Sequence, residues 1–309
     1  MTEENHNSKS MFHGFWALTN RDLKKWYKAP LLVLMSIIQP ILWMGLFGRA
    51  MNISAIFSPD RIAETLKSLP PLTINPPLTT DQMQGLLAFF GQFQGNIMQN
   101  TFGVSDYFSF MAVGMLSFVV VFTAMFSGMS IVWDRRLGFL NKALSTPVAR
   151  GAIIMSKVLS AVTRSLIQAA IVVVLAWLFG MQFSPSFTVL HLLGAFAALF
   201  LMCLGLSSLF LAIAIRSTRW ETQMAVVNLL NLPLIFTSNA LFPSNFMPDW
   251  LQTISYINPI TYGTDAARQL LILPAIDAAK LATDFAFLGG FALLFATIGI
   301  VLSWKYLSK

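Results

Sequence analysis

The feature that most constrains this chain is a series of long, nearly charge-free apolar runs. A helix that crosses the hydrocarbon core of a bilayer needs about 20 predominantly apolar residues. Only 11% of the residues are charged, whereas soluble domains carry about 25%. We therefore predict an all-α, polytopic membrane protein with six transmembrane helices, in which residues 31–309 form a single transmembrane domain. The expected spans are 31–48, 107–133, 152–180, 189–215, 223–242 and 285–304.

The distribution of Lys and Arg predicts the orientation of these spans. Cytoplasmic loops of membrane proteins carry an excess of the two basic residues. With the N-terminus inside, 14 of the 20 Lys and Arg lie on the cytoplasmic side. We therefore expect a multi-pass protein of the cell membrane with both termini in the cytoplasm. The net charge of +7 then reflects membrane topology and does not indicate a nucleic-acid partner.

Residues 1–30 form a cytoplasmic N-terminus with an amphipathic segment at 11–28. As a helix, this segment would place mostly apolar side chains on one side and basic side chains opposite. Such a helix suits the inner membrane interface, with its basic side toward anionic headgroups or a cytoplasmic partner. The alternative, a continuation of the first span, is disfavoured because Pro30 would kink or break the helix. The apolar side holds Phe12, Phe15, Trp16, Thr19, Leu23, Trp26 and Tyr27, and the basic side holds Arg21, Lys24, Lys25 and Lys28.

Two segments on the outer side are long and interrupted by proline. The outer loop 49–106 contains a stretch, 82–99, that is compatible with a helix near the outer surface. The segment 243–284 carries Pro243, Pro248, Pro259 and Pro274 among aromatic residues. We predict short re-entrant helices there, because broken backbone at membrane depth must be buried in protein or line a wet cavity.

Motifs for catalysis and metal binding are missing from the sequence. It has no G-x-x-x-x-G-K-[ST] phosphate loop, no H-E-x-x-H and no G-x-S-x-G, and it contains three His and one Cys. We therefore expect that this chain is not an enzyme and binds no metal or ATP of its own.

Polar residues within apolar spans are costly and mark candidates for a transport pathway. Arg164 shares a helical stripe with Lys157, Ser160 and Gln168. It is either a cation linked to substrate or coupling, or a structural residue that pairs with Asp134 or Glu221 or reaches the interface.

Two further groups of residues could line a pathway. Asn228 and Asn231 are three residues apart and share a helix face. Phe118, Phe122 and Met125 belong to a stripe at helical spacing. Such a stripe is usually packing, but it would also suit an adaptable cavity wall.

The short basic segment 134–150 is the most informative connection. Its apolar residues recur at partly helical spacing, and apolar residues on a short cytoplasmic helix need something to bury them. We interpret the segment as a docking site for a partner protein.

Two motifs in this chain together resemble the type-2 ABC exporter permeases. The first is Asp134-Arg-Arg-x-Gly-x-x-x-x-x-Leu-x-Thr-Pro-Val-x-Arg150. The second runs from Leu241-Phe-Pro through Met247-Pro-Asp-Trp-Leu and Asn258-Pro-Ile-Thr-Tyr to Asp265-Ala-Ala-Arg268. With the N-terminal helix and six spans, the likeness covers essentially the whole chain. The drug-exporter branch, with its daunorubicin-type permeases of bacteria and archaea, is the most similar.

The resemblance implies a transport subunit that works with a separate ATPase. Two permease copies, most simply a homodimer, would bind two ATPase subunits, and those subunits would hold ATP and Mg. Segment 134–150 would be the coupling helix, with 11–28 as the connecting helix beside it. The implied coupling residues are Asp134, Arg135, Arg136, Leu137, Gly138, Phe139, Leu140, Leu144, Pro147 and Arg150.

The resemblance also implies a route for the cargo. Spans 107–133 and 223–242 of each copy would line a central cavity, and ATP-driven closure would expel a hydrophobic or amphipathic, drug- or lipid-like compound by alternating access. The implied pathway residues are Phe118, Phe122, Met125, Arg164, Asn228 and Asn231, and the outer lid would include Pro243, Pro248, Trp250, Asn258, Pro259, Tyr262 and Arg268.

Two other classes of function compete with this interpretation. An ion-coupled secondary transporter or channel would need a coupling carboxylate within a span, and none of the 13 acidic residues lies in the middle of an expected span. An intramembrane enzyme would need paired Asp, a Ser–Lys pair or a His cluster at one depth, and no such set is evident.

Overall fold

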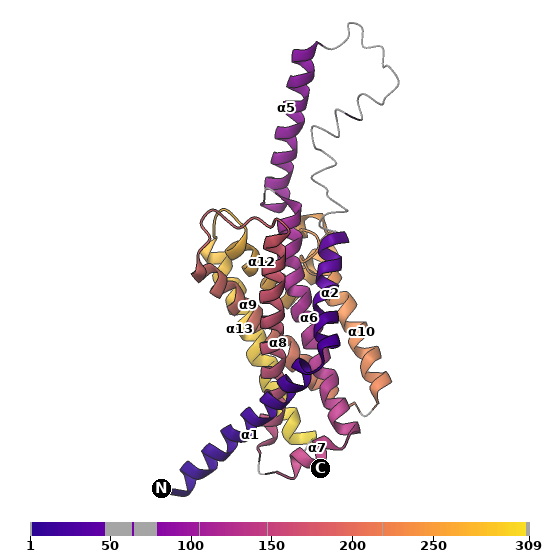
Figure 1. Cartoon of the computed structure of the whole chain (residues 1–309), viewed down its shortest axis with the longest axis vertical. Coiled ribbons are helices and arrows are strands. Elements are labelled where there is room, and N and C mark those ends of the chain that lie inside the picture. The colour runs from indigo at the N-terminus through magenta and orange to yellow at the C-terminus, as the bar shows by residue number, and fades with distance from the viewer. Residues whose placement is uncertain are drawn as a thin grey trace.

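The structure is a computed structural model of the 309-residue chain, and it describes residues 2–46, 64, 79–104, 106–146, 148–217 and 219–306. Every regular element in the described residues is a helix. Figure 1 shows an elongated bundle, with α1 and α7 near one end and α5 beyond the other. The helices are α1 (Thr2–Tyr27), α2 (Pro30–Trp43), α5 (Thr80–Ile97), α6 (Tyr107–Arg136), α7 (Phe139–Leu144), α8 (Arg150–Leu178), α9 (Val189–Ala214), α10 (Trp220–Phe236), α11 (Asp249–Ser255), α12 (Pro259–Leu271) and α13 (Ala278–Tyr306).

The long helices α6, α8, α9 and α13 form the body of the bundle. Each is long and apolar enough to cross a membrane, and each contains most of an expected span. Helix α6 is the most buried of the four and packs against α8, α9, α10, α12 and α2. Helix α9 packs against α6, α8, α12 and α13. The protein core therefore lies along α6 and α9.

Polar caps determine where several helices begin. Asp106 accepts hydrogen bonds from the backbone N–H groups of Phe108 and Ser109, at 3.1 and 2.8 Å, and so caps α6. Thr188 and His191 form a reciprocal capping box at the start of α9. These side chains satisfy N–H groups that have no partner within the helix, so His191 has a structural role at the start of α9.

The first expected span, 31–48, is shorter than predicted in the described residues. Helix α2 ends at Trp43, and a π turn continues to residue 46. The apolar stretch Val33–Leu46 is too short to count among the membrane-crossing helices. Residues 47 and 48 lie outside the described residues.

The fifth expected span, 223–242, has different bounds in the structure. Helix α10 runs from Trp220 to Phe236 and has 17 residues. It ends soon after Pro233, which lacks the N–H that would continue the backbone ladder. The next residues form a turn, in which the side chain of Arg268 on α12 satisfies the carbonyl groups of Asn239 and Ala240. The chain therefore leaves the helix earlier than its apolar composition predicted.

Helix α1 is separate from α2, as Pro30 predicted. It ends at Tyr27, and Pro30 occupies the first turn of α2, where its missing N–H costs nothing. Helix α1 leaves the bundle at an angle (Figure 1) and packs against α8. Its basic side is divided: Lys24 is exposed, whereas Arg21 and Lys25 turn toward Asp134 of the same chain.

The outer segments contain helices where the sequence predicted them, and their re-entrant position in the membrane stays a prediction. In loop 49–106, α5 coincides with the stretch 82–99 and projects away from the bundle (Figure 1). Residues 49–63, 65–78 and 105 of this loop lie outside the described residues. Segment 243–284 forms a 3₁₀ turn (Ser244–Phe246), α11, α12 and the start of α13. Because α13 begins at Ala278, Asp284 lies inside this helix and is buried. Asp134 is likewise buried in the last turn of α6, so two acids sit within membrane-length helices.

Candidate functional site

Helix α7 is a short helix held between the ends of two long ones. It lies between the end of α6 and the start of α8, and Gly138 begins it with a φ of 70°. This left-handed conformation disfavours residues with a side chain. No atom lies within 4 Å of a Cβ added at Gly138, so the requirement for glycine comes from the backbone alone.

A buried carboxylate joins three long helices next to α7. Asp134, in the last turn of α6, accepts from Lys157 Nζ at 2.6 Å, Arg21 Nη2 at 3.0 Å and Lys25 Nζ at 3.2 Å. Asp22 adds a second acid, 3.4 Å from Lys157. Because Lys157 and Asp134 have side-chain exposures of only 4% and 5%, this network replaces water around both charges. It joins α1, α6 and α8 next to α7.

Arg135 ties α6 to the end of α9. Its two terminal nitrogens donate to the carbonyl oxygens of Ile215 and Ser217, each at 2.7 Å. Carbonyls at a helix C-terminus lack partners within the helix and interact favourably with a cation. Arg135 therefore has a partner inside the protein, although we expected it to serve an ATPase.

The apolar residues of α7 are mostly buried by the chain itself. Leu140 and Ala143 are 3% and 5% exposed, and the small cavity beside them is lined by residues of α1, α6, α7 and α8. Phe139 is partly buried, with the guanidinium carbon of Arg21 3.1 Å from its ring centroid. Burial by a partner is thus unnecessary for these residues, and our sequence argument was wrong on this point because α1 and α8 cover them.

The outward surface of α7 consists of different residues. Arg136 and Leu137 are exposed, Leu137 by 71%, and Leu144 is partly buried. Arg150 is partly buried, and its Nη1 has no hydrogen-bond partner among the described residues. Pro147 lies outside the described residues. The exposed set, which we name the α7 outer surface, is Arg136, Leu137, Asn141, Lys142, Ser145 and Thr146.

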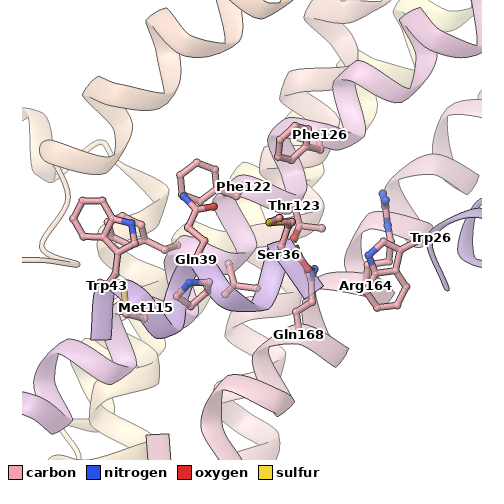
Figure 2. Close-up of a pocket in the computed structure, with 14 residues that line it drawn as sticks. Trp26, Ser36, Gln39, Trp43, Met115, Phe122, Thr123, Phe126, Arg164 and Gln168 are labelled. Carbon is pink, nitrogen blue, oxygen red and sulfur yellow. Dashed lines mark hydrogen bonds between the residues drawn. The ribbon is translucent and has the colours of Figure 1, made fainter. Parts of the chain in front are cut away.

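A cavity of about 330 Å³ lies between α2, α6 and α8, next to the end of α1 (Figure 2). Its walls are mainly aromatic and aliphatic, and its polar groups lie on α2, α6 and α8. Both Met35 and Phe126 line it and are more than half exposed, so the cavity opens on the side of the bundle. The lining residues are Trp26, Met35, Ser36, Gln39, Pro40, Trp43, Met115, Phe118, Val119, Phe122, Thr123, Phe126, Arg164 and Gln168.

A chain of hydrogen bonds runs along one wall of this cavity and joins three helices. Thr123 Oγ1 donates to Gln168 Oε1 at 2.7 Å, and Gln168 Nε2 donates to Ser36 Oγ at 2.5 Å. Ser36 in turn donates to the carbonyl of Val33 at 2.7 Å. Because each member has a partner, these polar groups can lie in an apolar wall at little cost. They fix α2, α6 and α8 together along one wall.

The predicted pathway residues do not form a single site within one chain. Phe118, Phe122 and Arg164 line the cavity. Met125 is buried in the core, at 4% exposure. Asn228 is exposed and Asn231 is partly buried on α10, and neither lines the cavity.

Arg164 is not paired as the structural alternative proposed. The partners of Asp134 are Lys157, Arg21 and Lys25, and Glu221 is exposed on α10. Arg164 Nε donates to the carbonyl of Ser160 in its own helix at 3.2 Å. Lys157, two positions earlier in the same stripe, binds Asp134 instead.

Arg268 is an internal anchor of the outer segment. Its Nη1 donates to the carbonyl of Asn239 at 2.7 Å, and its Nη2 donates to that of Ala240 at 2.8 Å. Its guanidinium carbon also lies 3.5 Å from the ring centroid of Phe110 on α6. Arg268 is 4% exposed, so it holds the turn after α10 against α6. Gly114 permits this approach, because an added Cβ would lie 2.1 Å from the Ala240 oxygen.

The other predicted lid residues divide between anchors and exposed positions. Asn258 Nδ2 donates to the carbonyl of Leu234 at 2.6 Å, while its Oδ1 accepts from the N–H of Ile260 at 2.9 Å. Tyr262 donates to the carbonyl of Tyr256 at 2.6 Å. The remaining positions are Pro243 and Pro259, which are buried, and Pro248 and Trp250, which are exposed.

Comparison with known proteins assigns the chain to a family. The family model for the ABC-2 type transporter matches residues 13–272. The chain belongs to this family. Members of the family are membrane-embedded permease subunits of ABC transporters and associate with an ABC ATPase subunit, so this chain is a multi-pass membrane permease.

Individual relatives agree with that assignment. The permease is 30% identical over 256 residues to the ycf38 transport permease of Porphyra purpurea, covering 82% of this chain and 72% of the relative. It is 26% identical over 186 residues to the daunorubicin resistance ABC transporter permease DrrB1 of Streptomyces coeruleorubidus, covering 60% and 64%. It is also 26% identical over 172 residues to the multidrug ABC transporter permease YbhR of Escherichia coli (strain K12), covering 55% and 45%.

Sequence reasoning missed two parts of the candidate site. It did not place α2 in the cavity, although Ser36, Gln39 and Trp43 lie three and four residues apart and therefore share a face. It also assigned Arg21 and Lys25 to headgroups or a partner, when the charge of Asp134 was the signal for an internal ion pair.

Proposed function

We propose that this chain is the permease subunit of an ATP-driven exporter. Two copies would form a homodimer with six spans each and both termini in the cytoplasm of a bacterium or archaeon. Two ATPase subunits would hold ATP and Mg and supply the energy. The permease would move a hydrophobic or amphipathic, drug- or lipid-like compound outward by alternating access.

The exposed surface of helix α7 and its position beside the Asp134 network support this proposal most directly. The helix is short and exposes a mixed polar and apolar surface, the α7 outer surface. The Asp134 network next to it joins α1, α6 and α8. A force applied to α7 by a closing ATPase would therefore act on three helices at once, because they share one buried charge network.

Helices α6 and α10 supply the proposed cargo route in the dimer. Phe118 and Phe122 on α6 give the apolar wall of the cavity beside α2 and α8, and Asn228 on α10 presents a separate, exposed polar group. The names of DrrB1 and YbhR describe drug resistance and multidrug transport, and by similarity they favour a small organic cargo. The segment after α10, anchored by Arg268, would form the outer lid.

The test is co-purification with a candidate ABC ATPase, followed by ATP hydrolysis measurements in lipid with and without the permease. We expect a stable complex whose hydrolysis rate rises with amphipathic compounds. The matched variants are Leu137→Asp on the α7 outer surface and Asn245→Asp, which is exposed in the 3₁₀ turn Ser244–Phe246 of the outer segment. Only Leu137→Asp should weaken the complex. Failure to form a complex with any candidate ATPase would contradict the proposal.

A further inference from the structure

The cavity between α2, α6 and α8 has one cationic group in its wall. Arg164 lies near the middle of α8, 14 residues after its first residue. Its Nε donates to Ser160, and no Asp or Glu in the described part of the chain lies within ion-pair distance of it. The nearby acids are occupied, since Asp22 and Asp134 bind Lys157 and Arg21. The terminal nitrogens of Arg164 thus remain available to a ligand.

The cavity has a polar region and an apolar region. Figure 2 draws Trp26 and Arg164 at one end, Ser36, Thr123 and Gln168 next to them, and Trp43 and Met115 at the other end. Trp26 lies at the end of α1, directly before the break that leads into α2. The cation of Arg164 and the polar groups of Ser36 and Gln168 suit a headgroup at that end. The other end, where Trp43, Met115 and Phe118 outnumber the one amide of Gln39, suits an apolar tail.

Size and access limit the occupant further. The volume of about 330 Å³ lies near the lower end of the range of ~300–1,000 Å³ for ligand pockets. The exposed Met35 and Phe126 at the opening would let a molecule enter from the side. A guanidinium binds carboxylate, phosphate or sulfonate groups through paired, charge-assisted hydrogen bonds.

We infer that this cavity binds a small anionic amphiphile, with its acidic group on Arg164 and its apolar part against Trp43 and Phe118. The shared chemistry admits two sources, a membrane lipid with an anionic headgroup or the exported cargo. Binding itself requires no ATPase; only the identification of the ligand as cargo rests on the proposed export function.

Quenching of tryptophan fluorescence tests the inference in the purified permease. The probe is decanoic acid with bromine on its terminal carbon, because bromine quenches nearby tryptophan. The neutral match is the alcohol with the same brominated chain. We expect saturable quenching by both, with binding of the acid about tenfold tighter, the effect of one hydrogen-bonded charge. The Trp43→Phe variant should lose most of the quenching, because the bromine lies at the Trp43 end.

Substitutions that change charge identify the group that produces the preference for the acid. Arg164→Gln should remove the preference for the acid over the alcohol, and Arg164→Lys should retain most of it. The matched control is Lys24→Gln, which removes an exposed cation of α1 and should leave the preference unchanged. Equal affinity for acid and alcohol in the unaltered permease would overturn the inference, as would a preference that survives Arg164→Gln. If Arg164→Gln does not fold, loss of the preference in a well-folded Arg164→Lys protein would also overturn it.

A second measurement separates the two sources. If the ligand is cargo, the acid should raise the ATP hydrolysis rate of the complex with the ATPase more than the alcohol does, and Arg164→Gln should abolish that difference. If the ligand is a resident lipid, mass spectrometry should find an anionic lipid that co-purifies with the permease and is depleted in Arg164→Gln. Either result supports the site, and absence of both together with equal quenching would contradict it.

Discussion

Lys157 Nζ lies 2.6 Å from Asp134 Oδ2, and both side chains are almost completely buried. The pair joins the start of α8 to the end of α6, on either side of α7. Removing Asp134 would leave Lys157 with Asp22 as its one remaining acid, at 3.4 Å, and the loss of a hydrogen bond to a charged group costs about 1.5–3 kcal/mol. We therefore expect Asp134→Asn to lower the stability of the permease by an amount in that range and to reduce ATPase coupling.

Thermal unfolding of the purified permease measures this effect. The matched variant is Lys25→Gln, since the Lys25 side chain is 51% exposed and an exposed pair contributes only about 0.2–1 kcal/mol. Equal melting temperatures for the unaltered protein and Asp134→Asn would contradict a central role for this network.

Arg268 offers a test of the anchor beneath the outer segment. Lysine at this position cannot reach the carbonyls of both Asn239 and Ala240 with the spacing of a guanidinium. We expect Arg268→Lys to cost about 2–5 kcal/mol, because buried carbonyl groups lose a charged donor. Limited proteolysis should then cleave the turn after α10 faster. Lys280→Gln, which removes a half-exposed partner of Asp265, is the control and should leave the cleavage rate near that of the unaltered protein.

Gly138 tests whether the backbone shape at the start of α7 matters for coupling. With a φ of 70° and open space around it, Gly138→Ala should cost about 1–2 kcal/mol from backbone strain. Gly138→Asn should cost less, because asparagine tolerates this conformation better. We expect stimulation of the ATPase to fall in the order Gly, Asn, Ala. The same stimulation in all three proteins would show that this conformation is dispensable.

Substitutions at Leu137 and Leu140 distinguish an effect on ATPase binding from an effect on the stability of the permease. Leu137 is 71% exposed and Leu140 is 3% exposed. Leu137→Asp should weaken binding of the ATPase and leave the melting temperature of the permease alone unchanged. Leu140→Asp should lower that melting temperature, because a carboxylate would be buried without a partner. The reverse pattern would mean that α7 presents the opposite surface to the ATPase.

The long apolar runs predicted the helices well because burial in hydrocarbon leaves few alternatives to a helix. They predicted less well where side chains from distant segments satisfy the backbone. Span 223–242 was expected to be helical throughout, but Arg268 and Asn258 stabilise the non-helical turn after Phe236, Asn258 through the hydroxyl of Thr237. Such contacts depend on residues more than 20 positions away, which no local pattern contains.

The candidate site, too, was predicted from the sequence only in part. Sequence patterns identified segment 134–150, but they did not show which of its residues face outward. The covering of Leu140 depends on α1 and α8, and the pairing of Asp134 depends on a choice among several nearby cations. The cavity needed α2 to be placed beside α6 and α8, and a hydrophobic run alone carries no such information.

One amide side chain, that of Asn258, serves the end of α10 and the beginning of α12 at once, through the carbonyl of Leu234 and the N–H of Ile260. The side chain of Asn258 therefore connects the two helices directly. A tilt of α10 would swing α12 with it, or break a hydrogen bond at each helix end. A rearrangement that starts at α10 and keeps both hydrogen bonds would therefore displace α12 as well.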